Sequence, residues 1–550
     1  MKKFLKVSLV IVAAALLSSC NCYKKMAKDS NAIRATSAPA LLSLRGNTVN
    51  ADVTVTFPAG YFNKKAILRI TPVMVFEGGE IAGTPKYIQG ERVKDNYTII
   101  SGNGGSYTQA VSFNWDPRLA VSRLELRFEA QCKNKDFVPF ALPRVIATGV
   151  SMLQTLASPH QAMEIMPDNF RRVTTNTQNA EFLYDINKSV VRNDQLTSSQ
   201  IRLFEEFIRG NANADRTVLS PVSARGYASP DGPTAFNDQL SRARSESGSA
   251  ALGNALSNVN NVRYDINFYG EDWDGFRRLV EASNIPDRNL ILQVLQMYSS
   301  PVQREQEIKN MSAVFEMLAK EILPQLRRTV FTATADVTGK TDAELLAAAR
   351  NNIQGLNLEE ALFAATLTDV AAEKAAIYRA AAERFNDARA YNNYAIQQMA
   401  AGDVAGAKAS LQRAVSLGSN PAVVNNQSVI AVAEGNLAEA RRLATSPQTQ
   451  AFVALAEGNF AEAARSLTEY NRAVAQAANG DYSSAKTALA NQTSADADFL
   501  KAIIAAREGQ TSEVVTNLRS AIQKNPALRS TWHRNGDLNR FYGTSEFSGL

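Results

Sequence analysis

Residues 226–247, with the sequence GYASPDGPTAFNDQLSRARSES, decide how the middle of the chain folds. A polar, glycine-rich turn follows the apolar run at 218–222 and opens into a helix in which Asn237 and Arg244 are seven residues apart. Two helical turns place both side chains on one face. An exposed guanidinium beside a side-chain amide, close to the free N–H groups of a helix start, is suited to binding a carboxylate. The stretch therefore predicts a ligand-binding platform.

The same residues resemble the peptidoglycan-binding domain of the OmpA-like family. The matching positions are Gly226, Tyr227, Asn237, Leu240, Ser241 and Arg244. Members of that family bind the diamino acid of the peptidoglycan stem through an aspartate just after the GY pair and through the late arginine. In this chain Ser229 takes the place of the aspartate, and Asp231 is the nearest carboxylate. The resemblance implies peptidoglycan contacts from Ser229, Asp231, Asn237 and Arg244.

Each of these side chains also has a purely structural explanation. Arg244 suits a solvated helix face, Asn237 a helix cap or turn, and Asp231 the polar position of a Pro-Asp-Gly turn. Leu240 is expected to pack in the core, as leucines of amphipathic helices usually do. Two expectations stay open: the domain binds peptidoglycan, or it keeps the fold without the ligand.

The flanking sequence predicts the rest of an α/β domain at 178–338. The segments 181–187 (EFLYDIN), 263–269 (RYDINFY) and 327–333 have the character of its first, third and closing strands. A helical stretch at about 273–323 lies between the last two. The resemblance implies a β-α-β-α-β-α-β order in which this stretch is an insertion.

The chain begins with a predicted export signal at 1–19. Its apolar run, 7–17, is too short to span a membrane, and the sequence LSSC at 17–20 follows. These four residues resemble a bacterial lipobox, which implies acylation of Cys20; an ordinary signal with a chance cysteine is the alternative. Lipoproteins exported to the surface carry an acidic run after that cysteine, whereas this chain has NCYKK. The resemblance implies an outer-membrane lipoprotein that faces the periplasm.

Charge and cysteine content narrow the class of protein. The formal charge of +6 includes three signal lysines, which leaves +3 on the mature chain. This charge is too small to indicate a nucleic-acid-binding protein. With Cys20 acylated, Cys22 and Cys132 remain. An oxidising periplasm permits a disulfide between them, and two free thiols are the alternative.

Next to the signal, the small and polar residues 20–45 predict a tether. Residues 46–150 contain alternating segments at 52–57, 66–73 and 124–129, separated by glycine pairs, which predict an antiparallel β-sandwich. A linker is expected at 151–177, where two prolines lie.

The rest of the chain is alanine-rich and helical, with a helical lead-in expected at 339–384, repeats at 385–530 and a tail at 531–550. Five glycines are each followed five residues later by a small residue: Gly402, Gly435, Gly458, Gly480 and Gly509, then Ala407, Ala440, Ala463, Ala485 and Val514. This spacing predicts stacked helical hairpins that turn at the glycines. The glycine spacings of 33, 23, 22 and 29 residues lie below the 34 of a tetratricopeptide repeat.

Residues 402–415, GDVAGAKASLQRAV, resemble the second half of a tetratricopeptide repeat. The resemblance implies an α-solenoid whose concave face binds an extended segment of an unidentified protein partner. A helical bundle without a partner is the alternative.

Catalysis has little support in the sequence. The two histidines, His160 and His533, complete no metal site or triad, and no catalytic, metal-binding or cofactor motif is present. We expect a multidomain, non-catalytic envelope scaffold without a cofactor, which links outer-membrane lipid to peptidoglycan. The alternative is an assembly or secretion accessory protein whose OmpA-like domain no longer binds peptidoglycan and docks proteins instead.

Overall fold

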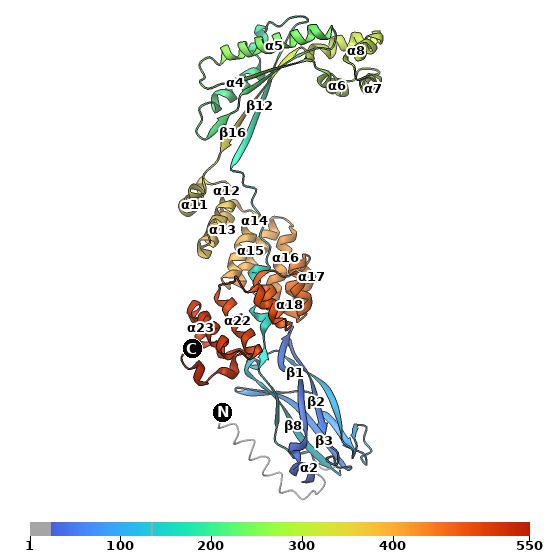
Figure 1. Ribbon diagram of the computed structural model, residues 1–550, viewed down its shortest axis with the longest axis vertical. Helices are drawn as coiled ribbons and strands as arrows, with labels where there is room; N and C mark the ends of the chain where they lie inside the picture. Colours follow the sequence, from blue (N-terminus) through green and yellow to red (C-terminus); the bar gives the residue numbers. More distant parts are fainter. Residues whose placement is uncertain (1–23, 134–135) are drawn as a thin grey trace. The chain divides into compact units, whose positions relative to one another are not determined.

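The computed structural model describes residues 24–133 and 136–550. They form two compact units, Met1–Asp168 with Ala349–Leu550, and Asn169–Ala348. The first unit joins a β-rich N-terminal region to an all-helical C-terminal region, as the sequence predicts (Figure 1). The second unit combines one sheet with helices.

Two sheets make up the β-rich region. One has the order β11-β1-β2-β7: β1 (Arg34–Arg45), β2 (Thr48–Phe57), β7 (Gly105–Asn114) and β11 (Val150–Ser151). The other has the order β10-β8-β3-β5-β6, with β4 and β9 at its margins: β3 (Ala66–Phe76), β4 (Gly79–Ala82), β5 (Lys86–Gly90), β6 (Thr98–Ile100), β8 (Arg123–Cys132), β9 (Val138–Pro139) and β10 (Arg144–Thr148). The 3₁₀ turn η2 (Pro117–Val121) precedes β8.

Alternation in the sequence explains why these sheets share one core. Val53 and Val55 of β2 and Leu68 and Ile70 of β3 are all buried in the same hydrophobic cluster. Their neighbours along each strand point away from it, as the period of two requires. All three strands predicted from alternating segments are present within β2, β3 and β8.

The expected tether at 20–45 is wrong over most of its length. It contains the short helix α2 (Lys24–Lys28), the 3₁₀ turn η1 (Ser30–Ala32) and the whole of β1, which pairs with β2 and β11. Leu42 and Leu44 of β1 are 1% and 4% exposed. The small residues before them hide the alternation, because Ala, Ser and Thr differ little in hydrophobicity.

The helical region stacks in hairpins, as the glycine spacing predicts. Helices α11 (Asp342–Asn351), α12 (Leu358–Ala364) and α13 (Ala371–Phe385), with turns η5 (Ile353–Gly355) and η6 (Ala365–Leu367), precede it. The hairpins are α14 (Ala388–Ala400) with α15 (Val404–Leu417), α16 (Pro421–Ala433) with α17 (Leu437–Leu443), α18 (Pro447–Glu457) with α19 (Phe460–Ser466), α20 (Glu469–Ala478) with α21 (Tyr482–Ala488), and α22 (Ala495–Glu508) with α23 (Thr511–Lys524).

Each of the five predicted glycines lies in the turn of a hairpin with a left-handed φ between 76° and 88°. Glycine adopts this conformation without steric cost. The small residue five positions later is 0% exposed in every hairpin, so the second helix packs closely at that point. The spacing therefore predicted both the turns and the contacts.

The expected tail at 531–550 is folded. After the turn η7 (Pro526–Ser530) it contains the short turns η8 (Trp532–Arg534), η9 (Asn539–Phe541) and η10 (Ser545–Phe547), and Trp532 is 2% exposed. The Asp537 side chain is fully buried, pairs with Arg507 and accepts a 2.9 Å hydrogen bond from the Ser151 hydroxyl. These contacts join the end of the chain to the β-rich region.

The second unit is built on a sheet with the order β12-β16-β14-β15: β12 (Val173–Leu183), β14 (Val222–Ala228), β15 (Tyr264–Glu271) and β16 (Arg328–Thr338), with β13 (Thr217–Leu219) beside β16. Helices α3 (Asn193–Leu196), α4 (Ser199–Asn211) and α5 (Thr234–Ala255) accompany it. Phe204 of α4 and Leu252 of α5 share a core with Phe182 and Phe331 of the sheet.

The predicted insertion forms helices α6 (Trp273–Ala282), α7 (Arg288–Met297), α8 (Pro301–Asn310), α9 (Ser312–Glu321) and α10 (Leu323–Leu326), which have a hydrophobic cluster of their own. The first strand starts at Val173, so the expected linker at 151–177 ends too late. The strand runs ten backbone pairs along β16 before it reaches Leu183.

Candidate functional site

The motif stretch forms the end of β14, a turn at 229–233 and helix α5. Gly226 and Tyr227, expected in the turn, are in the strand, where Gly226 pairs with Phe268 of β15 and Thr329 of β16. Gly226 faces α5 so closely that a Cβ there would lie 2.0 Å from the Ser241 carbonyl oxygen. Only glycine allows this approach of helix to strand.

Arg244 is not exposed, contrary to the expectation. It is 1% exposed, and its guanidinium donates to the carbonyls of Lys188 (2.9 Å), Tyr227 (3.0 Å) and Asp185 (3.2 Å). Burial lowers the pKa of Arg244 to about 10. The helix faces the loop that follows β12, and this loop supplies two of the three carbonyls. Arg244 therefore stabilises the junction of strand, loop and helix.

Ser229 and Asp231 are brought together, as predicted, but they bind each other and a third residue. The Ser229 hydroxyl donates to the Asp231 carboxylate at 2.6 Å. Arg327 donates to Ser229 at 3.2 Å and pairs with Asp231 at 3.2 Å. The side chains of this ion pair are 11% and 16% exposed, so the carboxylate is already neutralised within the domain.

Asn237 is 3% exposed and does not join Arg244. Its side-chain amide donates to the Gly232 carbonyl and to the Glu271 carboxylate, both at 3.0 Å. It thereby ties the turn before α5 to the end of β15. The four residues of the predicted site all serve contacts within the domain, and Arg244 is neither an exposed ligand-binding group nor the solvated helix residue of the structural alternative.

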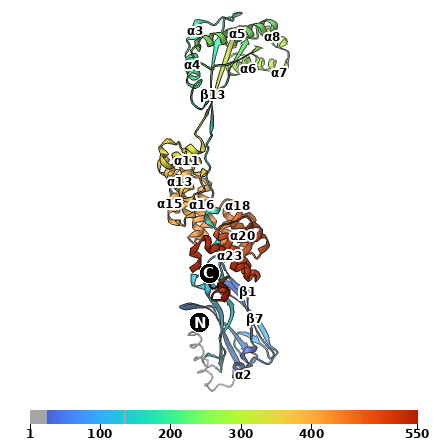
Figure 2. The ribbon, with the colours of Figure 1, turned by 60° about the vertical axis from the view of Figure 1, so that its left-hand side comes forward.

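A second site lies in the first unit, where residues 153–166 cross the helical hairpins. We call this segment the strap; it includes the 3₁₀ turns η3 (Leu153–Leu156) and η4 (Pro159–Ala162). It packs along α20, α18, α16 and α14, the first helices of four hairpins. The strap is the teal segment among the orange and red helices in Figures 1 and 2.

Three asparagines hold the strap by its main chain. Asn471 accepts from the Ser158 N–H at 2.7 Å and donates to the Ser158 carbonyl at 2.9 Å. Asn426 does the same for Glu164 at 2.6 and 2.8 Å. Asn393 does so for Met166 at 2.9 and 2.8 Å. Each side-chain amide thus satisfies both polar groups of one strap residue, which leaves recognition largely independent of strap sequence.

Further contacts strengthen this arrangement. Asn392 donates to the Glu164 carbonyl at 2.9 Å, and Gln448 donates to the Gln161 carbonyl at 2.8 Å. The strap side chains of Leu153, Ala162, Met163 and Met166 belong to the hydrophobic core of the helices. The strap runs opposite to the order of the hairpins, since Ser158 meets α20 and Met166 meets α14.

The helices therefore hold an extended segment, but it comes from the same chain. The predicted linker at 151–177 is a packed part of the fold, because its main chain is hydrogen-bonded and its apolar side chains are buried. A partner segment was expected in this position. While the strap is bound, its main chain takes both amide groups of the three asparagines, so a second segment could not bind them in the same way.

A sequence signal for this site was present but missed. Asn-Asn pairs occur at 392–393 and at 425–426, a spacing of 33 residues that equals the distance from Gly402 to Gly435. Asparagine is unfavourable inside helices, so a repeated pair at hairpin spacing indicates a shared role. Asn471 has no such partner in sequence, and it is 1% exposed.

Cys132 is disulfide-bonded and 4% exposed, which agrees with the expected bridge. Cys20 and Cys22 lie outside the described residues, and so does the predicted signal at 1–19. Within residues 24–133 and 136–550, no helix is both long and apolar enough to cross a membrane. In the same part of the chain, no group of three or more His, Cys, Asp and Glu side chains is placed to hold a metal ion.

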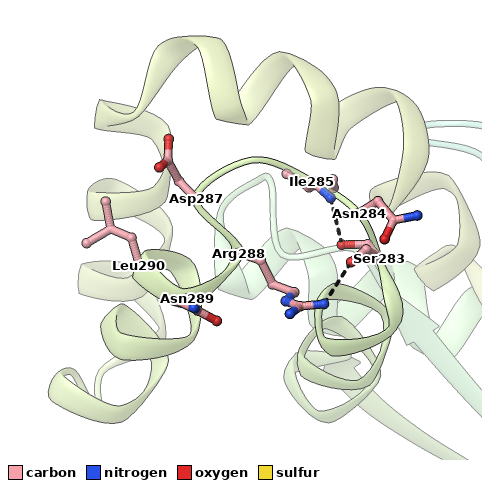
Figure 3. Close-up of a pocket in the computed structure, with 7 residues that line it drawn as sticks. All are labelled: Ser283, Asn284, Ile285, Asp287, Arg288, Asn289 and Leu290. Carbon is pink, nitrogen blue, oxygen red and sulfur yellow. Dashed lines mark hydrogen bonds between the residues drawn. The ribbon is translucent and has the colours of Figure 1, made fainter.

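An open pocket of about 570 Å³ lies at the turn between α6 and α7 (Figure 3). Arg288 turns back there and donates to the Ser283 carbonyl at 3.1 Å. All its lining residues come from the stretch 283–290, and none of the predicted site residues is among them. A hollow made by one local turn offers no converging groups for a ligand.

No family model matches the chain, and no curated protein matches it. Among solved structures, the chain is similar to the crystal structure of Salmonella alpha-2-macroglobulin reacted with methylamine, at 12% sequence identity and a TM-score of 0.12. The likeness covers 82% of this chain and 27% of that chain, so this chain spans about a quarter of the other. At that TM-score it carries no argument.

Proposed function

We propose that this protein is a non-catalytic envelope lipoprotein that acts as an assembly or secretion accessory protein. Acylated Cys20 anchors it in the outer membrane on the periplasmic side. Its OmpA-like domain serves as a protein-docking module and does not bind peptidoglycan. The tetratricopeptide-like hairpins hold their own strap, and a protein partner binds them outside the groove or by displacing the strap.

One observation favours this function over a link to the cell wall. The Arg244 guanidinium, which would have to bind the ligand carboxylate, is 1% exposed and donates to three carbonyls of its own domain. Releasing it would break three hydrogen bonds from a charged donor, at a cost of roughly 1–3 kcal/mol for each. Ser229 and Asp231 support the same view, since Arg327 already occupies them.

Cosedimentation with purified peptidoglycan tests this choice. The full chain, made without the signal and with Cys20→Ser so that it is soluble, is mixed with sacculi at low ionic strength. We expect no saturable pelleting. Pelleting that saturates with protein, and that a free diaminopimelate-containing stem peptide competes away, would establish the wall-binding function instead.

Metabolic labelling with palmitate tests the anchor separately. We expect label in the wild-type protein and none in the Cys20→Ser variant, with Cys22→Ser as the matched control that keeps its label. Undiminished labelling of Cys20→Ser would exclude acylation at that residue.

A further inference from the structure

The short helix α2 is fixed to one end of the β-rich region by its single apolar anchor. Met26 is 1% exposed, its carbonyl accepts from the Tyr61 hydroxyl at 2.8 Å, and its sulfur accepts from the Asn63 N–H at 3.2 Å. The three lysines of α2 are exposed. Because one side of the helix is bound to the loop at 60–63, these lysines face outward.

Other cations gather around this helix. Lys25, Lys64, Lys65 and Arg92 line one open hollow together with the 60–63 loop, and Arg92 donates its N–H to the Lys64 carbonyl at 2.8 Å. We call this set the basic tip: Lys24, Lys25, Lys28, Lys64, Lys65 and Arg92, all of them exposed.

Few acids balance the basic tip. Glu91 pairs with Lys64 at 3.5 Å, and Asp29 lies next to Lys28 in sequence. Among residues 24–133 and 136–550, no ion pair to the other five cations is formed. A surface with this excess of positive charge attracts anions, and several lysines close together attract an anionic surface more strongly than a single ion.

The basic tip is also where the acylated end of the chain must lie. Lys24 is the fourth residue after Cys20, and an extended chain over that step reaches roughly 14 Å at most. Cys132, which is disulfide-bonded, pairs across the sheet with Ala66, the residue after Lys65. A disulfide from Cys132 to Cys22, one of the two alternatives that the sequence leaves open, would hold the acylated cysteine at this end.

We propose that the basic tip binds the anionic phospholipid headgroups of the membrane in which the acyl chains are inserted. This inference rests on the proposed anchoring at Cys20. The acyl chains alone would let the β-rich region swing on a flexible attachment. Contacts between six cations and lipid phosphates would hold that region against the bilayer in one orientation.

Vesicle cosedimentation of the non-acylated chain, with Cys20→Ser, tests the basic tip without requiring the anchor. Vesicles are made of phosphatidylcholine alone or with about one third phosphatidylglycerol. We expect binding only to the anionic vesicles and weaker binding as salt is raised. Combining Lys24→Gln, Lys25→Gln, Lys65→Gln and Arg92→Gln should lower the partition coefficient at least about tenfold.

A matched variant removes four exposed positive charges from the helical region of the same unit: Arg465→Gln, Arg519→Gln, Arg529→Gln and Arg534→Gln. It should bind anionic vesicles like the parent chain. Equal loss in both variants, or no binding to anionic vesicles, would overturn the proposal. Competition by glycerol 3-phosphate at constant ionic strength would also overturn it, because it would indicate a site for a single phosphate.

The outcomes separate this inference from the proposed function. If palmitate labelling fails while the basic tip binds vesicles, the proposed acylation of Cys20 is wrong and the proposed lipid binding by the basic tip is supported. If labelling succeeds and vesicle binding fails, the anchor stands and the basic tip has no lipid role.

Discussion

Arg244 occupies the position that the family resemblance assigns to a ligand-binding arginine, yet it bonds only to its own domain. The sequence correctly predicts that Asn237 and Arg244 lie on one helix, since helical spacing is a local property. Their partners are not local. The carbonyls of Lys188 and Asp185 are 56 and 59 residues away along the chain, and the fold of β12 brings them there. Motif spacing carries no information about such contacts.

The first prediction concerns this arginine. Replacing Arg244 with Met should destabilise the second unit by about 3 kcal/mol, because three carbonyls of the domain lose a charged donor. Chemical denaturation measures the loss of stability, and hydrogen exchange of α5 measures it locally.

Arg242→Met on the same helix is the matched control. Arg242 is exposed and lies over the Phe268 ring at 4.0 Å, so its loss should cost less than about 1 kcal/mol. Equal effects of the two substitutions would show that Arg244 has no special structural role.

At the scale of elements, the sequence predicted the hairpins but not the strap. Glycine turns follow from a residue's own conformational freedom, so Gly402 and Gly435 could be placed from sequence. The strap could not be placed from sequence, because the repeated residues that hold it are asparagines of the helices. Its main chain follows the asparagines of three helices, and its own sequence resembles a proline-containing linker.

The prediction for the residues of β1 was wrong for a related reason. Its hydrophobic contrast is confined to Leu42 and Leu44, and the remaining pairing with β2 is made by main-chain atoms of small residues. Strands of this kind are specified by their neighbours in the sheet, which a single sequence does not display.

The second prediction tests whether the asparagine hydrogen bonds hold the strap. Asn426→Ala should destabilise the first unit by about 2 kcal/mol, because the Glu164 N–H loses its partner inside the protein and the Glu164 carbonyl keeps only its bond from Asn392. Urea denaturation measures the change.

Asn491 is exposed in a turn between helices, and Asn491→Ala should stay within about 0.5 kcal/mol of wild type. If Asn426→Ala behaves like this control, the asparagine bonds contribute nothing to holding the strap.

The third prediction concerns pH and His160 of the strap. Burial lowers the pKa of His160 below the ordinary histidine value of 6.5, against a smaller opposing effect of Asp496. The folded protein therefore binds fewer protons than the unfolded chain just below pH 6.5, and its stability falls as the pH drops through that range. His160→Gln should lose less stability than wild type between about pH 7.5 and 5.5. Denaturation curves at both pH values compare them, and identical losses would contradict the assignment.

At the scale of the whole molecule, the chain has two compact units. The strap and the folded C-terminal turns make the β-rich region and the helices one unit, since they join the two regions. The sequence predicted a linker for the first segment and a tail for the second. The number of compact units therefore depended on the two segments whose sequence was least informative.

The fourth prediction follows from this joining. A fragment of residues 349–550 should melt at least about 5 °C below the full first unit, because buried asparagines and apolar side chains lose the strap. A peptide of residues 151–168 added in trans should recover part of the loss.

The matched control is the same peptide N-methylated at positions 158, 164 and 166, which removes the three donated N–H groups. It should have no effect on melting. Equal recovery by both peptides would show that the main-chain bonds do not determine strap binding.

Hydrogen exchange across the strap in the intact protein is the most direct measurement, because it asks whether the chain fills its own groove in solution. The account predicts that the N–H groups of Ser158, Glu164 and Met166 exchange about as slowly as those within helix α16, and that Asn426→Ala speeds the exchange at Glu164. Exchange of residues 153–166 at the rate of an unstructured peptide would mean that the groove is open, and the account would be wrong.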